Sequence, residues 1–517
     1  MRNGSTRGFL MRLYAMKYRQ FTIDKGSWRV LPLVASAGGL AVLTLVLMFW
    51  NLGANSISIS SDEVIYTRVT QGVLHDGAFF PLMHGNVPTF EKPPLKLWLG
   101  ALAPWILGES NFSFRVVDGA LGVFAVLGSA LLAWRVSRSM PGALAVGFLV
   151  LGMPEWIIAQ HGFRKAVLDG LLTLLTIGIA WSAWRAIEAR ERISARYFFW
   201  IGALASFAVL TKSVAGFVPL ACAVCSLGVI APRQILTRKS LWLALPAFIF
   251  VAYVFAVWQV GGMRGLRMFL GVEIIDRAFS GFDGHNTGSN WFYVWYILKR
   301  GGSAPRWLVW FGLIGALVSA RGDLRMRYLL VWSALPVFAY SLSASKAPWY
   351  IAPFFPFVCM LAVFGTSALL EALRTRSKLH WFGTLVCIVA VYLSGASYSR
   401  AISRNLLEVS TDTKRIPIDL LTERLKGEYS KFAVVESSIS GRSNPRNGRF
   451  NVEGIYRETL KPDLLIVTRV SELQPESRRV YFVKEPSLGA LPPGWSEVGR
   501  LAPSALRQWG VVAVVYP

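Results

Sequence analysis

Ionisable side chains stand at the ends of long apolar segments or in the short stretches between them. The set is Asp62, Glu63, Glu91, Lys92, Arg164, Lys165, Asp169, Lys212, Glu273, Arg277, His285 and Lys346. A charge near the centre of a membrane helix costs about 2.5 to 3.5 kcal/mol, so charges bordering such segments usually have partners or a chemical role. Carboxylates can take a proton from an attacking hydroxyl, and several cations together can hold a phosphate.

The acidic candidates stand where helices are expected to begin. Asp62, followed by Glu63, opens a short helix, and Asp169 opens an apolar span. A carboxylate at such a place can act as a base if burial or neighbours raise its pKa toward the working pH. Two simpler interpretations stay open: Asp62 satisfies helix amides, and Asp169 forms a salt bridge with Arg164 or Lys165.

The basic candidates come from four separate loops or span ends: Lys92, Lys212, Arg277 and Lys346. Arginine offers a fork to two phosphate oxygens and lysine offers a point charge. Each residue alone is more often a side chain that reaches up to the lipid headgroups. Their expected placement on one side of a membrane favours a shared phosphate site.

The elements that position these residues are expected to be membrane helices. The 517 residues are 54% hydrophobic and 16% charged, with a mean hydropathy of +0.46, which exceeds what a soluble domain needs. A span needs about 20 apolar residues. We expect a mainly α bundle of about 11 to 13 spans, with these candidates: 31–51, 114–134, 142–160, 167–187, 197–211, 214–231, 241–260, 305–320, 328–345, 349–371 and 381–399.

The net charge of +25 follows this threading and does not indicate nucleic acid. Basic clusters mark cytoplasmic loops. With the basic N-terminus inside and the first span an uncleaved anchor, every cluster falls on the cytoplasmic side: 135–138, 185–196, 233–239, 321–327 and 374–378. The other side then receives the loops 52–113 and 261–304, the turns near His161, Lys212 and Lys346, and the C-terminal tail.

Two domains are expected. Residues 1–399 form the membrane domain, with loop helices at about 60–110, one from Ser60 or Ser61 and one after Pro93 and Pro94. Residues 400–517 form a small extracytoplasmic α/β domain, whose strand-like runs are 432–435, 464–467, 480–483 and 511–515. The four cysteines lie inside apolar spans, where no disulfide or redox chemistry is expected.

Several motifs resemble one family. SSDEVIYTRV and FEKPPL, then RKAVLDGLLTLL, FAVLTKSVAGFVPL and YSLSASKAPWYIAPFFP, resemble in this order segments of bacterial lipid A aminoarabinose transferases and of other glycosyltransferases that use polyprenyl-phosphate sugars. The similarity runs from the first span to about residue 370. It implies a membrane enzyme of the GT-C fold, related to the protein mannosyltransferase superfamily.

The resemblance also implies roles for single residues. Asp62 matches the catalytic or acceptor-orienting aspartate, and Asp169 matches the aspartate of the second acidic motif. The lysines near the donor phosphate, the phosphate-binding arginine and the late motif correspond to Lys92, Lys212, Arg277, Lys346 and Tyr350. The chain departs from the family at two positions, where Ile65 and Ile274 replace polar residues. Because Ile274 replaces a histidine, no metal is expected to be required, with Glu91 and His285 as weak ligands at most.

The implied reaction is an inverting transfer on the periplasmic face of a bacterial inner membrane. A polyprenyl-phosphate-linked sugar is the donor, and the acceptor is lipid A or another envelope lipid, glycan or protein. Cations stabilise the leaving phosphate, and Asp62 orients or deprotonates an acceptor hydroxyl. A transporter or flippase predicts polar residues through the depth of the spans and inverted repeats, neither of which the sequence shows. A non-enzymatic envelope assembly protein stays a third alternative.

Overall fold

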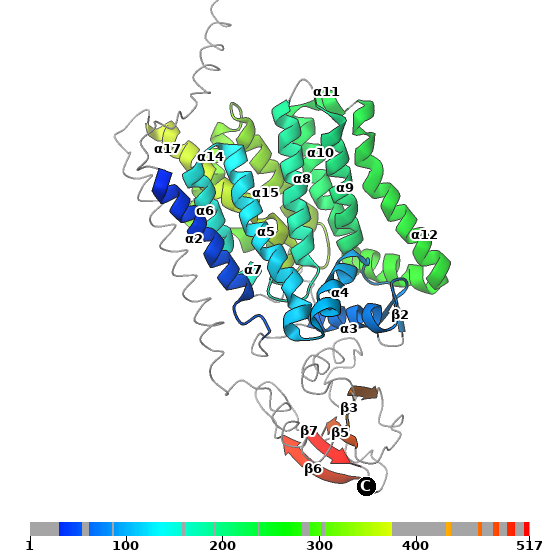
Figure 1. The fold of residues 1–517 in the computed structure, drawn as a ribbon. Helices are drawn as coiled ribbons and strands as arrows, with labels where there is room; N and C mark the ends of the chain where they lie inside the picture. Colours follow the sequence, from blue (N-terminus) through cyan, green and yellow to red (C-terminus); the bar gives the residue numbers. More distant parts are fainter. Residues whose placement is uncertain are drawn as a thin grey trace, which may run out of the picture.

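A bundle of long apolar helices dominates the molecule, with a small β-sheet near the C-terminus (Figure 1). The structure is a computed structural model. It describes residues 30–53, 61–84, 87–157, 161–189, 193–235, 237–281, 289–300, 306–374, 431–435, 464–467, 479–484, 494–501 and 511–515. Most of these residues are helical, and several of the helices are long and apolar enough to cross a membrane. This confirms the mainly helical, multi-pass membrane architecture expected from the sequence.

The helices of the bundle coincide with the predicted spans from 31–51 to 349–371. They are α2 (Val30–Phe49), α5 (Asn111–Ser137), α6 (Met140–Leu151), α8 (Asp169–Ala189), α9 (Ala195–Lys212), α10 (Phe217–Ile230), α12 (Leu245–Leu266), α14 (Arg306–Ser319) and α15 (Leu324–Ser341), followed by the series η6 (Pro348–Phe354), α16 (Phe355–Met360), η7 (Leu361–Gly365) and α17 (Thr366–Arg374). The segment 142–160 is not one continuous helix, because α6 ends at Leu151 and the short α7 (Pro154–Ile157) follows. The segment 381–399 and the N-terminal arm lie outside the described residues.

Five helical stretches of the described chain are long and apolar enough to cross a bilayer: 111–137, 169–189, 195–230, 238–280 and 348–372. Four shorter apolar helices accompany them, at 33–49, 95–107, 140–151 and 306–319. The stretch 195–230 contains two bundle helices, α9 and α10, which are joined by the turn η3 (Ser213–Gly216). A Cβ on Gly216 would lie 2.3 Å from the backbone nitrogen of Val209, so only glycine fits where the chain turns back on α9.

Short elements gather at one end of the bundle. The helices α3 (Ser61–His75) and α4 (Leu95–Leu107) are the two predicted loop helices, and the hairpin β1 (Leu82–His84) and β2 (Val87–Thr89) lies between them in sequence. Figure 1 shows α3, α4 and β2 together at this end and α11 (Pro232–Ile235) at the opposite end. The remaining short helices are η4 (Arg238–Ala244), η5 (Arg267–Ser280) and α13 (Phe292–Arg300).

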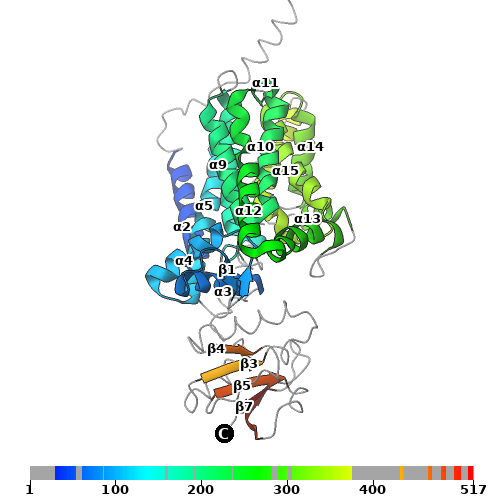
Figure 2. The same cartoon turned by 90° about the vertical axis from the view of Figure 1, so that its right-hand side faces the viewer.

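The region 261–304 is more helical than the loop predicted there. α12 continues to Leu266, where it passes into the π-helix η5. Gly262 interrupts the helix with a φ of 55°, a backbone conformation that favours glycine. Figure 2 shows α12 running along the outside of the bundle and bending at its lower end toward α13. This bend carries η5, and with it Glu273 and Arg277, to the end where α3 lies.

The C-terminal region contains a five-stranded sheet in the order β4-β3-β5-β7-β6. The strands are β3 (Lys431–Val435), β4 (Leu464–Val467), β5 (Arg479–Lys484), β6 (Ser496–Leu501) and β7 (Val511–Val515). β3 pairs in parallel with both β4 and β5, whereas β7 is antiparallel to β5 and β6. The four predicted strand runs are present, and β6 is a strand that the sequence analysis missed.

Candidate functional site

The first turn of α3 holds two neighbouring carboxylates in different environments. Glu63 is fully buried and accepts two hydrogen bonds from Arg115 of α5, at 2.6 Å from Nε and 3.1 Å from Nη2. It also accepts a bond from the backbone nitrogen of Ala166. Glu63 therefore fastens α3 to α5 and to the turn before α8. This position suits support of the site better than the catalytic role proposed from the sequence.

Breaking this ion pair should destabilise the fold. In Arg115→Met, the buried Glu63 carboxylate loses the arginine that donates two hydrogen bonds to it, which should cost about 3 to 5 kcal/mol. The apparent melting temperature in detergent should fall by several degrees, and the double variant Glu63→Met/Arg115→Met should recover much of the loss. Arg325→Met removes a more exposed pair with Asp323 and should cost less than about 1 kcal/mol. An unchanged melting temperature in Arg115→Met would contradict this structural role.

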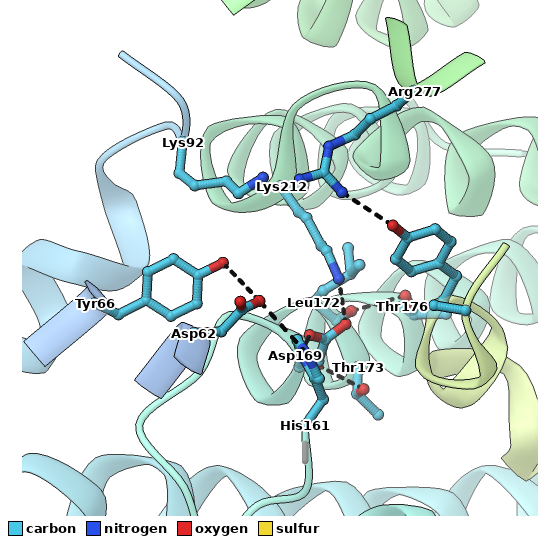
Figure 3. Close-up of polar contacts among 12 residues, drawn as sticks. Asp62, Tyr66, Lys92, His161, Asp169, Leu172, Thr173, Thr176, Lys212 and Arg277 are labelled. Atoms are coloured by element: carbon cyan, nitrogen blue, oxygen red, sulfur yellow. Dashed lines mark hydrogen bonds and ion pairs between the residues drawn. The ribbon is translucent and has the colours of Figure 1, made fainter. Parts of the chain in front are cut away.

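Asp62 is the more accessible of the two acids, with its side chain 36% exposed. The Tyr66 hydroxyl donates to its Oδ2 at 3.4 Å, and Nε2 of His161 lies 3.5 Å from the same oxygen. Both contacts are long, so the carboxylate is held loosely and keeps an oxygen for another partner. Figure 3 shows Asp62 between Tyr66 and His161, close to Asp169.

Asp169, at the start of α8, is buried and bonded on both oxygens. Nδ1 of His161 lies 2.8 Å from Oδ2, and Nζ of Lys212 lies 2.5 Å from Oδ1. The simpler interpretation of Asp169 named Arg164 or Lys165 as its salt-bridge partner. Arg164 instead donates to the backbone carbonyls of Leu47 and Trp50. The partners of Asp169 are therefore His161 and Lys212 of the site itself. His161 also links Asp169 to Asp62.

His161 is the residue of this site that the sequence analysis missed as a candidate. His161 is 9% exposed, and its ring stacks on Trp349, with ring centroids 4.4 Å apart and planes 9° from parallel. One ring nitrogen faces Asp169 and the other faces Asp62. The available signal was a histidine eight residues before Asp169, in a turn already expected on the same side of the membrane. That signal does not reveal that the ring joins two acids.

A second group of charges surrounds Glu273 of η5. Lys92 donates to Oε2 of Glu273, and Arg277 approaches the same carboxylate with Nε at 3.1 Å and Nη2 at 3.2 Å. Arg277 also donates from Nη1 to the Tyr350 hydroxyl at 3.0 Å. Burial lowers the pKa of Lys92 from its usual value, and the Glu273 carboxylate opposes this shift.

Lys212 connects the two groups. Its ammonium contacts Asp169 and lies 5.5 Å from the centre of the Tyr350 ring, which also carries the hydroxyl bonded to Arg277. Figure 3 shows Lys212 extending from the side of Lys92 and Arg277 toward Asp169. Three of the four predicted cations are thus brought together with both predicted aspartates.

Lys346 is connected to this cluster through the loop on which it lies. Its Nζ donates to the backbone carbonyl of Ser343 at 2.6 Å, and its side chain is buried. The same loop is bonded to η5, because the backbone nitrogen of Ser345 donates to the carbonyl of Arg277 at 3.0 Å. In this geometry Lys346 braces the loop that supports Arg277, and its direct contact with a phosphate stays a prediction.

The described residues contain no group of three His, Cys, Asp or Glu side chains arranged to hold a metal ion. His285 lies outside the described ranges, and Glu91 stands beside Lys92. What the arrangement offers is a set of buried and half-buried cations that can bind an anion, next to an accessible carboxylate. Such a pair of features suits attack on a substrate that carries a phosphate leaving group.

Several known proteins with a similar sequence are named as glycosyltransferases. A family model described as "Dolichyl-phosphate-mannose-protein mannosyltransferase" matches residues 91–258. Undecaprenyl phosphate-alpha-4-amino-4-deoxy-L-arabinose arabinosyl transferase from Erwinia tasmaniensis is 30% identical over 356 residues, and transferase 2 of that name from Proteus mirabilis is 27% identical over 351 residues. Each alignment covers 64% of this chain and 60% of the relative, so the chain spans less than two thirds of their length.

A solved structure shares the fold. The crystal structure of ArnT from Cupriavidus metallidurans bound to undecaprenyl phosphate superposes with a TM-score of 0.65, at 16% identity, and covers 95% of this chain and 98% of that one. The chain therefore has the expected GT-C fold and is similar in sequence to the aminoarabinose transferases that its motifs resemble.

Proposed function

We propose that this chain, built on the fold of the aminoarabinose transferases, is a membrane glycosyltransferase that uses a polyprenyl-phosphate-linked sugar. It passes the sugar to lipid A or to another envelope acceptor at the periplasmic face of a bacterial inner membrane. The basic loops then lie in the cytoplasm, and α3, α4 and η5 lie at the periplasmic boundary. The membrane domain carries the catalysis, and residues 400–517 form a separate periplasmic domain.

One observation carries this proposal. The buried charged side chains of the described chain all belong to segments that meet at the α3 end of the bundle: Glu63, Lys96, Arg115, Asp118, His161, Arg164, Lys165, Asp169, Glu273 and Lys346. A transport pathway would need polar groups through the depth of the bundle. A cluster of charges at one end of the bundle suits a lipid whose tail stays in the membrane while its phosphate reaches the aqueous boundary.

The roles of the residues follow from their positions. Lys92, Lys212 and Arg277 neutralise the charge that grows on the phosphate as the bond to the sugar breaks. Asp62, accessible and loosely held, orients the acceptor and takes its proton when the acceptor is a hydroxyl. If the acceptor is itself a phosphate, it arrives ionised and needs no strong base. Asp169 and His161 keep Lys212 and Asp62 in place.

A deletion strain tests the function whichever sugar is transferred. Mass spectrometry of lipid A and other envelope glycolipids should show a sugar that disappears with the gene and returns with the wild-type copy. Lys92→Ala should not restore it. Arg233→Ala, a matched loss of one exposed charge at the opposite end of the bundle, should restore it fully. Full restoration by Lys92→Ala at equal protein level, or no change in any envelope sugar, would refute the proposal.

The bridging position of His161 gives a second prediction. His161→Ala should lower kcat about tenfold to a hundredfold, because a displacement of about 1 Å in a catalytic group can have such an effect. His161→Asn keeps a donor near the position of Nδ1 but does not reach Asp62. It should recover the melting temperature of the wild type but not its kcat. Wild-type kcat in His161→Asn would show that the contact with Asp62 has no part in turnover.

A further inference from the structure

The candidate phosphate site already contains an anion that belongs to the protein. Glu273 is 8% exposed, and its carboxylate touches Lys92 through Oε2 and Arg277 through both oxygens. These are the two cations that the proposed function assigns to the donor phosphate. A carboxylate with two oxygens on a lysine and an arginine fork makes the contacts that two phosphate oxygens would make. An arriving phosphate must therefore share these cations with Glu273 or displace it.

The net charge of these side chains determines how much negative charge the site can bind. Lys92 and Arg277 together carry two positive charges, and Glu273 removes one of them. Lys212 is engaged with Asp169 at 2.5 Å, so its charge is already balanced in the same way. The site next to η5 therefore offers a net of about one positive charge, whereas without Glu273 it would offer two.

The donor lipid and the product lipid of the proposed reaction differ in the charge of their phosphate. The donor is a phosphodiester with one negative charge. In the transfer, the bond from the sugar carbon to the phosphate oxygen breaks, its electrons stay on that oxygen, and a bond from the same carbon to the acceptor oxygen forms. The product is a phosphate monoester, whose second ionisation near pH 6 brings its charge toward −2 at neutral pH. A site with two free cations would hold this product more tightly than the donor.

We propose that Glu273 is a specificity-determining residue that matches the site to the singly charged donor and weakens its hold on the doubly charged lipid phosphate product. This inference rests on the proposed function and concerns the same site. Glu273 repels the extra charge that appears after transfer, so the spent lipid leaves and a new donor can enter. Its position on η5, one helical turn before Arg277, keeps the carboxylate beside the arginine throughout.

Binding measurements with defined lipids test this inference. The probes are undecaprenyl phosphate, its methyl phosphodiester and uncharged undecaprenol, titrated into the full-length protein in detergent at pH 7.5. In Glu273→Gln, we expect the affinity for the monoester to rise by about tenfold or more relative to the diester, because one unit of repulsion at close range is removed. This preference should shrink at pH 5.5, where the monoester carries a smaller charge.

Glu188→Gln is the matched control. Glu188 also accepts from two arginines, Arg135 and Arg138, but at the other end of α5 and α8. Glu188→Gln should leave the affinities for the monoester, the diester and undecaprenol unchanged. Equal weakening of monoester and diester by Glu273→Gln would overturn the inference, since Glu273 would then only hold the cations in place. If the wild type bound undecaprenol as tightly as both phosphates, the phosphate site of the proposed function would fail as well.

Discussion

Asp62→Asn is expected to lower kcat for transfer to a hydroxyl acceptor by about 10² to 10⁴-fold, the usual contribution of a general base. Asparagine has the same shape and can still accept from Tyr66, so the fold and the KM for the donor should stay close to those of the wild type. Initial rates of purified variants, with product followed by mass spectrometry, provide the measurement. With an acceptor that attacks through a phosphate oxygen, the loss should be about tenfold or less, because no proton has to be removed.

The adjacent residue supplies the control for this prediction. Glu63→Gln alters a carboxylate in the same helical turn, but one that is bonded to Arg115 and fully buried. It should lower the melting temperature and the yield, while the kcat of the folded fraction stays within a few fold of the wild type. A wild-type rate for Asp62→Asn with a hydroxyl acceptor would remove Asp62 from the chemistry. The reverse pattern, with kcat lost only in Glu63→Gln, would exchange the roles of the two acids.

The sequence was sufficient to predict that these residues lie at one end of the bundle, because hydropathy and basic loops assign each span end to a side. Asp62, Lys92 and Lys212 could be grouped in this way although they are distant in the chain. The partner of each residue could not be predicted. Neighbouring positions on a helix point about 100° apart, so which of Asp62 and Glu63 faces Arg115 depends on how α3 is rotated against α5.

The regions that sequence reasoning missed share a physical cause. The histidine bridge depends on the distance between two acids from different elements, and no local pattern encodes that distance. η5 lies in a region whose charges and glycines interrupt the apolar run, so it was predicted as loop rather than as a continuation of α12. The strand β6 carries alternating polar residues without a strong apolar run. In each case tertiary contacts decide the structure.

Lys212→Met should nearly abolish transfer and also weaken the fold. Lys212 is the last residue of α9, just before the tight turn at Gly216, and its ammonium is the cation bonded to the buried Asp169. Its removal takes the ammonium away from a buried carboxylate, which keeps its contact with His161, at a cost of about 3 to 5 kcal/mol. It also removes one donor that stabilises the leaving phosphate, which should lower kcat by about 10² to 10³-fold.

A double variant separates these two effects. In Lys212→Met/Asp169→Asn the buried carboxylate charge is gone as well, so the melting temperature should return to within a few degrees of the wild type. Transfer should stay at the level of the single variant, because the cation beside Tyr350 and Arg277 is still missing. Thermal unfolding and initial rates of the monodisperse protein measure the two quantities separately. If rate and stability recovered together, Lys212 would act only through the fold, and the phosphate would have to be held by Lys92 and Arg277 alone.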